Sequence, residues 1–296
     1  MDWVTVEDPG NVAYDRPDTN PLFSGPRGSV VYKYRISKTE LTNTQWAEFV
    51  QAFSPYWEGS PSSFDLTGVG VVTPDNGTTY VAARGVEYAP ADVTWQLAAM
   101  YANWMHNGKS GERAAFESGA YDTSDWVWDH SNPNSITGTF ERQDGARFWI
   151  PNEDEWIKAV YYDPNRYGEG QGGYWQWPTA SDNPTPADQT SASMSDLARF
   201  LPVGSFPDAV SPWGLLDVSG GLPEWLENSL QGSHTVFLVD GSGTGLGWPD
   251  AEDWIDWRPQ TFRPTTGSIG LRLAARVPTP SVVLPFLFVF AWRRRW

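Results

Sequence analysis

Apolar residues recur at helical spacing in three segments, and each segment begins at a residue that commonly caps a helix. Thr42 with Gln45 has the spacing of a capping box, Thr94 can cap the second helix, and Asn152 with Glu155 opens the third. The segments are residues 42–53, 94–108 and 152–162. Their apolar faces are Trp46, Phe49, Val50 and Phe53; Leu97, Met100, Tyr101 and Trp104; and Trp156, Ala159 and Val160. The pattern therefore predicts three helices.

Alternation of apolar and polar positions is clearest just before the first helix. Val30, Tyr32, Tyr34 and Ile36 fall on one side of an extended chain, which predicts a half-buried strand that runs straight into that helix. A short hairpin is expected around residues 75–77. Long stretches between these elements lack any period, and no linker divides the chain. A single loop-rich α+β domain fits this pattern best.

The amino-acid composition restricts the possible functions of the chain more than it restricts the possible folds. The 296 residues include 28 Gly, 24 Pro and 18 Trp, which suits a loop-rich protein with many indoles for a core or for ligand contact. The formal charge of −16 disfavours binding to nucleic acid, because it repels phosphate, and it could attract calcium. No cysteine is present, so disulfides, thiolate metal sites and cysteine nucleophiles are excluded.

Five phrases, in order along the chain, resemble the formylglycine-generating enzyme (sulfatase-modifying factor) family. They are "YRISKTELTNTQWAEFV", "DVTWQLAAMYANWM", "ARFWIPNEDEWIKAVYY", "VGSFPDAVSPWGLLDVSGGLPEW" and "SIGLRLAARVP". The resemblance covers residues 29–277 and implies a C-type-lectin-like α+β fold, loop-rich, with few helices and short strands. We expect residues 1–28 to form an N-terminal surface segment and residues 278–296 to form a separate tail.

We do not expect this chain to catalyse the reactions of that family. Its oxidases hold copper through two cysteine thiolates, and this chain has none. A second branch binds iron through histidines, but His106, His130 and His234 are widely spaced here and are interpreted as ordinary polar residues. The prediction leans against an enzyme and leaves open a divergent metal-dependent oxidoreductase.

The stretch Gly220-Gly221-Leu222-Pro223-Glu224-Trp225 departs from the pattern that the resemblance implies, Gly-Asn-Val-Trp-Glu-Trp. Gly221 occupies the position of an Asn that is expected to help bind calcium in the family, and Pro223 occupies the position of a Trp. Glu224 could still contribute to a calcium site. The favoured interpretation is structural, with Trp225 in the core and Glu224 held by loop amides or by an arginine such as Arg272.

Indoles and carboxylates concentrate in residues 245–264, a pattern typical of sugar binding, since rings stack on sugar C–H faces and acids accept from hydroxyls. The alternative is that the indoles fill the core while the acids are solvated. The candidate ligand-binding residues are Trp248, Trp254, Asp256, Trp257 and Arg258.

The end of the chain, "VPTPSVVLPFLFVFAWRRRW", resembles the PEP-CTERM sorting signal of exported bacterial proteins. That resemblance implies processing by an exosortase and a location at the cell surface or outside the cell. Residues 1–10 show neither the basic nor the apolar region of an export signal. Together these observations predict a non-catalytic ligand-binding or structural protein of the bacterial cell envelope, whose partner is an extracellular polysaccharide or a surface protein.

Overall fold

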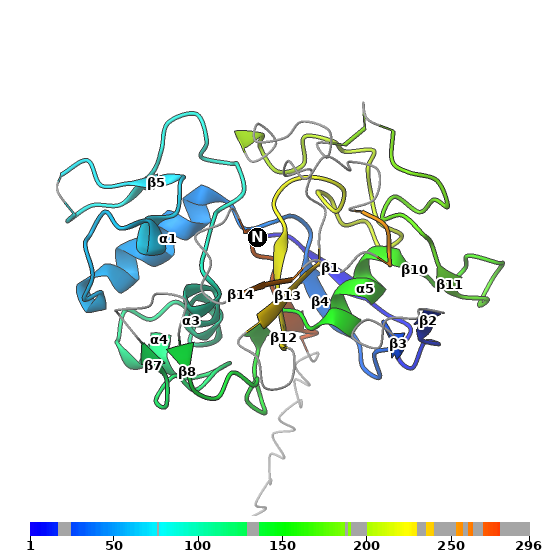
Figure 1. Cartoon of the computed structure of the whole chain (residues 1–296), viewed down its shortest axis with the longest axis horizontal. Coiled ribbons are helices and arrows are strands. Elements are labelled where there is room, and N and C mark those ends of the chain that lie inside the picture. Colours follow the sequence, from blue (N-terminus) through cyan, green and yellow to red (C-terminus); the bar gives the residue numbers. More distant parts are fainter. Residues whose placement is uncertain are drawn as a thin grey trace, which may run out of the picture.

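The structure is a computed structural model of the chain. It describes residues 1–16, 25–75, 77–128, 136–186, 189–190, 200–229, 235–239, 253–256, 260–262 and 269–278. Within these ranges it contains five α-helices, one short 3-10 helix and strands of two to six residues. This confirms the α+β class with few helices and short strands. Helices α1, α3 and α4 gather at one end and α5 lies toward the other, with strands between them (Figure 1).

The first helix, α1 (Asn43–Phe53), starts as its sequence predicts. The Thr42 hydroxyl accepts from the amide of Gln45, and the Gln45 side chain accepts from the Thr42 amide, which completes the capping box. Its apolar face is buried, and the rings of Trp46 and Phe49 stack with centroids 4.7 Å apart. The 3-10 helix η1 (Ser54–Tyr56) and the short α2 (Phe64–Thr67) follow it.

The second long helix, α3 (Trp95–His106), is buried over most of its surface. Thr94 caps it by accepting from the Leu97 amide, and Asn107 follows it. The Asn103 side chain donates to the carbonyls of Phe116 and Tyr121, so one buried amide fixes the loop after α4 (Ala114–Glu117).

The central sheet has four antiparallel strands in the order β1 (Trp3–Val6), β4 (Tyr34–Ser37), β15 (Ala274–Arg276) and β9 (Phe148–Trp149). The predicted strand from Val30 is shorter in the structure, because the chain bends at residues 31–32 before pairing begins. β1 comes from the segment that we expected on the surface, so part of residues 1–28 is integrated into the sheet. The domain boundaries themselves stay a prediction.

The remaining strands form small antiparallel units around this sheet. Two of them, β5 and β6, make the hairpin predicted around residues 75–77. The pairs are β2 (Tyr14–Arg16) with β3 (Gly25–Arg27), β5 (Val71–Val72) with β6 (Val81–Ala82), β7 (Val127–Trp128) with β8 (Ile136–Thr137), and β10 (Tyr162–Asp163) with β11 (Gly173–Tyr174). A three-stranded sheet contains β12 (Glu224–Ser229), β13 (Thr235–Val239) and β14 (Gln260–Phe262).

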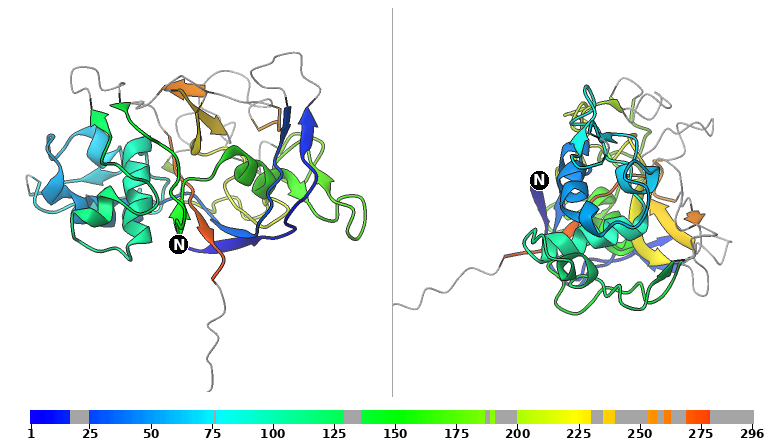
Figure 2. Two further views of the ribbon diagram at one scale, coloured as in Figure 1. Left: turned by 90° about the horizontal axis from the view of Figure 1, so that it is seen from below. Right: turned by 90° about the vertical axis from the view of Figure 1, so that its left-hand side faces the viewer.

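The third long helix, α5 (Glu153–Tyr161), contacts β12, β13 and β3. In the left view of Figure 2 its green ribbon lies beside the dark blue strands of the β2–β3 hairpin. Its capping box joins Asn152 and Glu155. From Glu155 to Tyr161 every residue is buried, including Lys158. Glu155 and Trp156 are both among these buried residues, and both take part in buried polar contacts described below.

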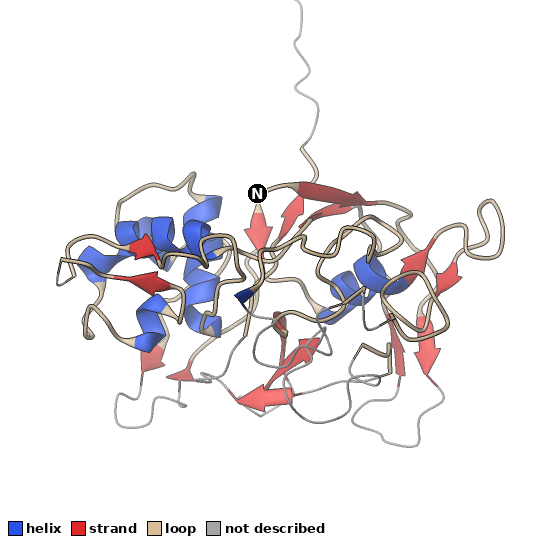
Figure 3. Cartoon of the chain, turned by 90° about the horizontal axis from the view of Figure 1, so that it is seen from above, coloured by secondary structure: helices blue, strands red, loops and turns tan. Residues whose placement is uncertain are grey.

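The buried apolar residues form one hydrophobic cluster that is rich in aromatic side chains. Seen from above, helices gather at the left-hand end, and strands and loops lie between them and the helix at the right (Figure 3). Residues 279–296 of the predicted tail lie outside the described residues. In the ranges given above, no helix combines the length and the apolar character needed to span a bilayer.

Candidate functional site

The glycine-rich turn before β12 makes room for a buried carboxylate that the sequence did not single out. Gly220 and Gly221 both have left-handed backbones, with φ of 78° and 92°. A Cβ added at Gly221 would lie 3.0 Å from Glu40 Oε2, and one at Gly270 would lie 2.9 Å from Glu40 Oε1. The two glycines therefore create the space that the Glu40 carboxylate fills.

Glu224, which follows that turn, is held by an arginine and an indole. Arg272 Nε donates to Glu224 Oε1 over 2.9 Å, and the Nη2 of Arg272 lies 2.9 Å from the same oxygen. Trp156 Nε1 donates to Glu224 Oε2 over 2.6 Å. The structure thus brings together Glu224 and Arg272, the pair suggested from the sequence.

Arg272 is fully buried, and its remaining donors are also used. Its Nη1 donates to the carbonyl of Ser37 over 2.8 Å and its Nη2 to that of Leu216 over 2.9 Å. A buried guanidinium with these partners joins β4, the loop before the glycine turn, and β12. Trp225 is also fully buried, and its Nε1 donates to the carbonyl of Val93 over 2.7 Å.

Glu40 is the functional candidate that sequence reasoning missed. It is only 2% exposed; its Oε1 accepts from the Leu222 amide over 3.2 Å, while Oε2 has no hydrogen-bond partner. Burial, followed by the negative charges of Glu224 and Asp217, raises the pKa of Glu40 well above its usual range. The adjacent Gly-Gly turn was the one signal in the sequence, since such a turn often lets a side chain approach the backbone closely.

Calcium bound through Glu224 does not fit the residues present. Both oxygens of its carboxylate accept hydrogen bonds from nitrogen donors of Arg272 and Trp156, whereas calcium requires six to eight oxygen ligands. Over the described ranges no group of three or more His, Asp or Glu side chains is placed to hold a metal ion. His106 accepts from the Arg147 amide, and His130 and His234 lie outside the described residues.

The candidate ligand-binding residues divide into three cases. Trp254 is 39% exposed and available at the surface. Asp256 is engaged within the protein, because Arg27 Nη2 donates to its Oδ1 over 3.1 Å and the Tyr14 hydroxyl donates to its Oδ2 over 3.3 Å. Trp248, Trp257 and Arg258 lie outside the described residues. Of the five, Trp254 is thus the described residue whose side chain is presented to solvent.

The neighbours of Trp254 explain why it is presented there. Asp253 and Ile255 on either side of it are buried, and the Ser219 hydroxyl donates to the Asp253 carboxylate. The Ile255 amide donates to the Gln176 carbonyl over 3.0 Å. These contacts fix the short segment on both sides, so that the indole between them points outward.

Comparison with known proteins agrees with the fold and its motifs. A search of curated proteins finds no match to this chain. Among solved structures, "Crystal Structure of CarF" is 18% identical, with a TM-score of 0.56, and the match covers 94% of this chain and 99% of that one. "Treponema denticola variable protein 1" is 17% identical, with a TM-score of 0.53, over 93% and 95% of the two chains. At these identities the likeness shows the fold alone.

The family is established by a match over almost the whole sequence. The family described as "Sulfatase-modifying factor enzyme 1-like domain" matches residues 2–276, a range that contains all but the last two residues of the five motif phrases. The match confirms the resemblance predicted from those phrases and includes β1 near the N-terminus. This chain therefore belongs to the sulfatase-modifying factor enzyme 1-like family.

Proposed function

We propose that this protein is a non-catalytic ligand-binding or structural protein of the bacterial cell envelope, built on the sulfatase-modifying factor scaffold. The observation that carries the proposal is the complete absence of cysteine from a chain of this family. Formylglycine generation by a copper–thiolate site needs cysteine sulfur, because soft thiolates are what select cuprous ion. The scaffold is retained here without the side chains for that chemistry.

The turn before β12 supports the same proposal. Glu224, Arg272 and Trp156 form a buried group whose polar atoms bond one another and the backbone. Such a group stabilises a loop-rich fold and offers no reactive atom to a substrate. In a domain with short strands, contacts of this kind fix the loops that any ligand-binding surface requires.

An extracellular polysaccharide or a surface protein is the partner that we propose. The 39% exposed indole of Trp254 can stack on the C–H face of a sugar ring, as aromatic platforms do. The export part of the proposal rests on the tail sequence, with its Pro-x-Pro motif, apolar run and terminal arginines. Exosortase-type processing would then release the domain or attach it at the cell surface.

The test is a glycan array probed with the full chain and with Trp254→Ala. We expect binding to a subset of glycans that falls by about tenfold or more in the variant, since an aromatic contact of this kind contributes on the order of 1–2 kcal/mol. Tyr167→Ala is the matched control, because Tyr167 is an exposed aromatic residue in another loop. Binding unchanged in Trp254→Ala would remove this residue from the proposal.

The alternative function, a divergent metal-dependent oxidoreductase, has no specific observation in its favour among the described residues. Elemental analysis of the purified protein and incubation with a sulfatase-derived peptide address it directly. Stoichiometric copper or iron together with oxygen consumption would support the alternative. Conversion of the peptide to its aldehyde would overturn the non-catalytic proposal.

A further inference from the structure

One face of the central sheet is turned away from the core, and the proposed carbohydrate contact does not use it. In β4 the side chain of Tyr34 is fully buried, while the next residue, Arg35, is partly exposed. Successive residues of a strand point to opposite faces, so Arg35 marks the outward face. Arg35 pairs with Thr5 of β1 and with Ala275 of β15. Ala275 pairs in turn with Phe148 of β9, so these residues form one row across the outward face.

Two aromatic rings from opposite edges of the sheet meet over this face. Trp3 belongs to β1 and Phe148 to β9, which are the two edge strands. With two strands between them, the backbones of the edge strands are expected about 14 Å apart. The centroids of the two rings are nevertheless only 5.6 Å apart, so the rings extend toward each other over β4 and β15. Both side chains are only partly buried, so this face presents aromatic surface to solvent.

Three arginines border these rings. The guanidinium of Arg35 lies 5.2 Å from the centroid of the Trp3 ring, and that of Arg147 lies 6.0 Å from the centroid of the Phe148 ring. Arg35 Nε donates to the carbonyl of Arg276 over 3.0 Å, which places the third arginine beside the first. Arg147 and Arg276 are exposed. We call the surface made by these five residues the arginine face.

Within the described part of the chain, no carboxylate forms an ion pair with any of the three arginines. The ion pairs found there involve other basic residues. Arg147 Nη1 donates instead to the carbonyl of His106 over 3.1 Å. Burial, followed by the positive charges of Arg147 and Arg276, lowers the pKa of His106, as expected beside cations without a close acidic partner. In a chain with a formal charge of −16, the arginine face is a local concentration of positive charge.

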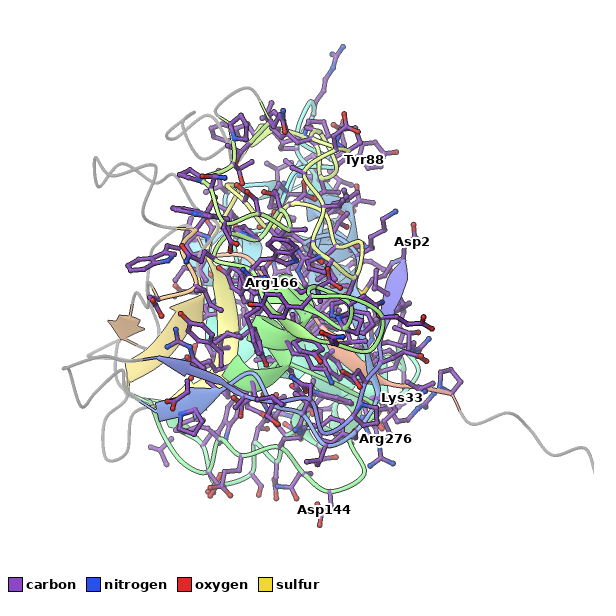
Figure 4. All side chains as sticks on the ribbon, turned by 90° about the vertical axis from the view of Figure 1, so that its right-hand side faces the viewer. Asp2, Lys33, Tyr88, Asp144, Arg166 and Arg276 are labelled. Carbon is purple, nitrogen blue, oxygen red and sulfur yellow. The ribbon has the colours of Figure 1, made fainter. Side chains whose placement is uncertain are left out.

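The acidic residues at the margin of the arginine face leave this charge in place. Asp2, Lys33 and Arg276 lie along one edge of the molecule (Figure 4). Glu7 is paired with Lys33 over 3.1 Å, so its charge is already balanced. Asp2 precedes β1, and its carbonyl accepts from the amide that follows β4.

The sequence beyond this face indicates what covers it. β15 ends at Arg276, and the described residues end at Pro278. Residues 281–292 are an apolar run followed by three arginines, and residues 277–296 contain no Asp or Glu that could neutralise the face. A run of this length is short for a membrane span and suits a segment at the membrane interface. An apolar segment combined with a basic surface is the pair of signals that holds a protein stably on an anionic membrane.

We propose that the arginine face docks on the anionic headgroup layer of a membrane. Arg147 and Arg276 bond lipid phosphates, while the rings of Trp3 and Phe148 lie at the level of the headgroups. Because the chain carries a charge of −16, its other faces are repelled, and the arginine face sets the orientation of the domain. The inference rests on the envelope location in the proposed function. It is independent of the contact at Trp254, so failure here leaves the glycan test untouched.

The first test is cosedimentation of the full chain with two kinds of vesicle. One kind is phosphatidylcholine alone, and the other is an equimolar mixture of phosphatidylcholine and phosphatidylglycerol. We expect binding to the anionic vesicles that weakens as salt is added, because salt screens the attraction. Equal binding to both kinds would mean that the apolar tail acts without the arginine face. That result, or no binding to the anionic vesicles, would overturn the proposal.

The double variant Arg147→Gln with Arg276→Gln assigns the binding to this face. Both side chains are exposed, so the variant is expected to fold. Affinity for anionic vesicles should fall about fivefold for each arginine removed, the usual contribution of a basic residue near a charged membrane. The matched control is Arg84→Gln with Arg113→Gln, which removes the same charge from exposed arginines beside β6 and α4. Equal losses in the two double variants would mean that net charge alone governs binding and would contradict the assignment.

A fluorescent label reports the contact in a chain that keeps all its arginines. Because the chain has no cysteine, Val277→Cys provides a single attachment point next to Arg276, at a residue that is 38% exposed. Tyr88→Cys is the control position, since Tyr88 is 67% exposed in another loop. An environment-sensitive dye at residue 277 should brighten on anionic vesicles, and one at residue 88 should not. Any other pattern in the bound protein would overturn the proposed orientation.

A sulfated polysaccharide is the other kind of polyanion that this face could contact, and dextran sulfate is the probe for it. Binding of dextran sulfate that depends on Arg147 and Arg276, with no binding to anionic vesicles, would identify a polymer as the partner. That result would overturn the membrane proposal. Binding to anionic vesicles that is lost in the double variant would support it.

Discussion

Two buried arginine–carboxylate groups lie near α5, and they are built differently. In the first, Arg272 is fully buried and bonds Glu224 and two backbone carbonyls. In the second, Arg142 is 23% exposed, donates to Glu155 over 3.1 Å, and lies 3.8 Å from Glu227. Both groups place a guanidinium against carboxylates, but only the first is closed off from solvent.

In the second group the Glu155 carboxylate is fully buried, whereas Arg142 and Glu227 are partly exposed. Glu155 accepts from Trp149 Nε1 over 3.0 Å and from the Tyr32 hydroxyl over 2.6 Å, and the guanidinium of Arg142 lies over the Trp149 ring at 4.5 Å. Burial outweighs the positive charge of Arg142 and raises the pKa of Glu227 to about 7. The enclosed guanidinium of Arg272 thus bonds three separate segments, while the partly exposed Arg142 only partly offsets the effect of burial on the pKa of Glu227.

The largest expected effect comes from removing the two arginines. Arg272→Met leaves Glu224 buried with Trp156 as its remaining side-chain partner, and we expect the free energy of unfolding to fall by about 3–5 kcal/mol. Arg142→Met should cost less, about 1 kcal/mol, because Glu155 keeps the donors of Trp149 and Tyr32 and Glu227 is partly exposed. Urea denaturation measures both, with the exposed Arg113→Met as control. Equal losses for the two buried variants would contradict the distinction between the groups.

A smaller effect is expected where the glycine turn approaches Glu40. Gly221→Ala places a methyl group 3.0 Å from Glu40 Oε2 in a left-handed backbone, and a loss of about 2 kcal/mol follows from the strain and the contact together. Gly10→Ala is the matched control, since Gly10 has φ of 81° and open space around the added carbon. Thermal or urea denaturation compares them, and equal losses would mean that Glu40 yields freely to the methyl group.

The smallest effect should appear in the pH dependence of the second group. Because the folded state raises the pKa of Glu227 from 4.5 to about 7, it holds the proton more tightly than the unfolded chain does. The contribution of Glu227 is therefore fully present below about pH 4.5 and is lost as the pH rises through 7. Glu227→Gln should remove about 1 kcal/mol of this decline between pH 5 and 8.

Measurement of unfolding free energies at a series of pH values checks this last prediction. The Gln variant can still accept from the Tyr121 hydroxyl, which bonds Glu227 over 3.0 Å, so the folded structure is expected to persist. A control at the first group, Glu224→Gln, should lower stability at every pH, since that carboxylate is paired with Arg272. An unchanged pH profile in Glu227→Gln would show that this carboxyl does not set the decline.

The helices were predictable because their signals are local. Thr42, Thr94 and Asn152 each cap the helix that follows, and the apolar faces assigned by spacing are buried. Strand limits were less predictable, since Tyr32 fits the alternation but only residues from Tyr34 onward find a partner strand. A strand needs neighbours for its hydrogen bonds, and one of the two neighbours of β4, β15, lies more than two hundred residues away in the sequence.

Among the site residues, the prediction succeeded where chemistry allowed few choices. A buried carboxylate such as Glu224 requires a donor, and Arg272 was a reasonable partner. The sequence was less informative about Asp256, because nothing near this residue in the sequence indicates its contacts with Arg27 and Tyr14. Glu40 was overlooked for the same reason, since its neighbours in space, Gly221 and Gly270, are far from it along the chain.

The helices, the α+β class, the family and the lack of thiolates can be predicted from the amino-acid sequence, because each depends on short-range spacing or on which residues exist. The pairing and the enclosure of the acidic side chains follow instead from the folded arrangement of the chain. Burial and electrostatic coupling arise when distant segments meet, so identical Glu residues at 40, 224 and 227 acquire different roles.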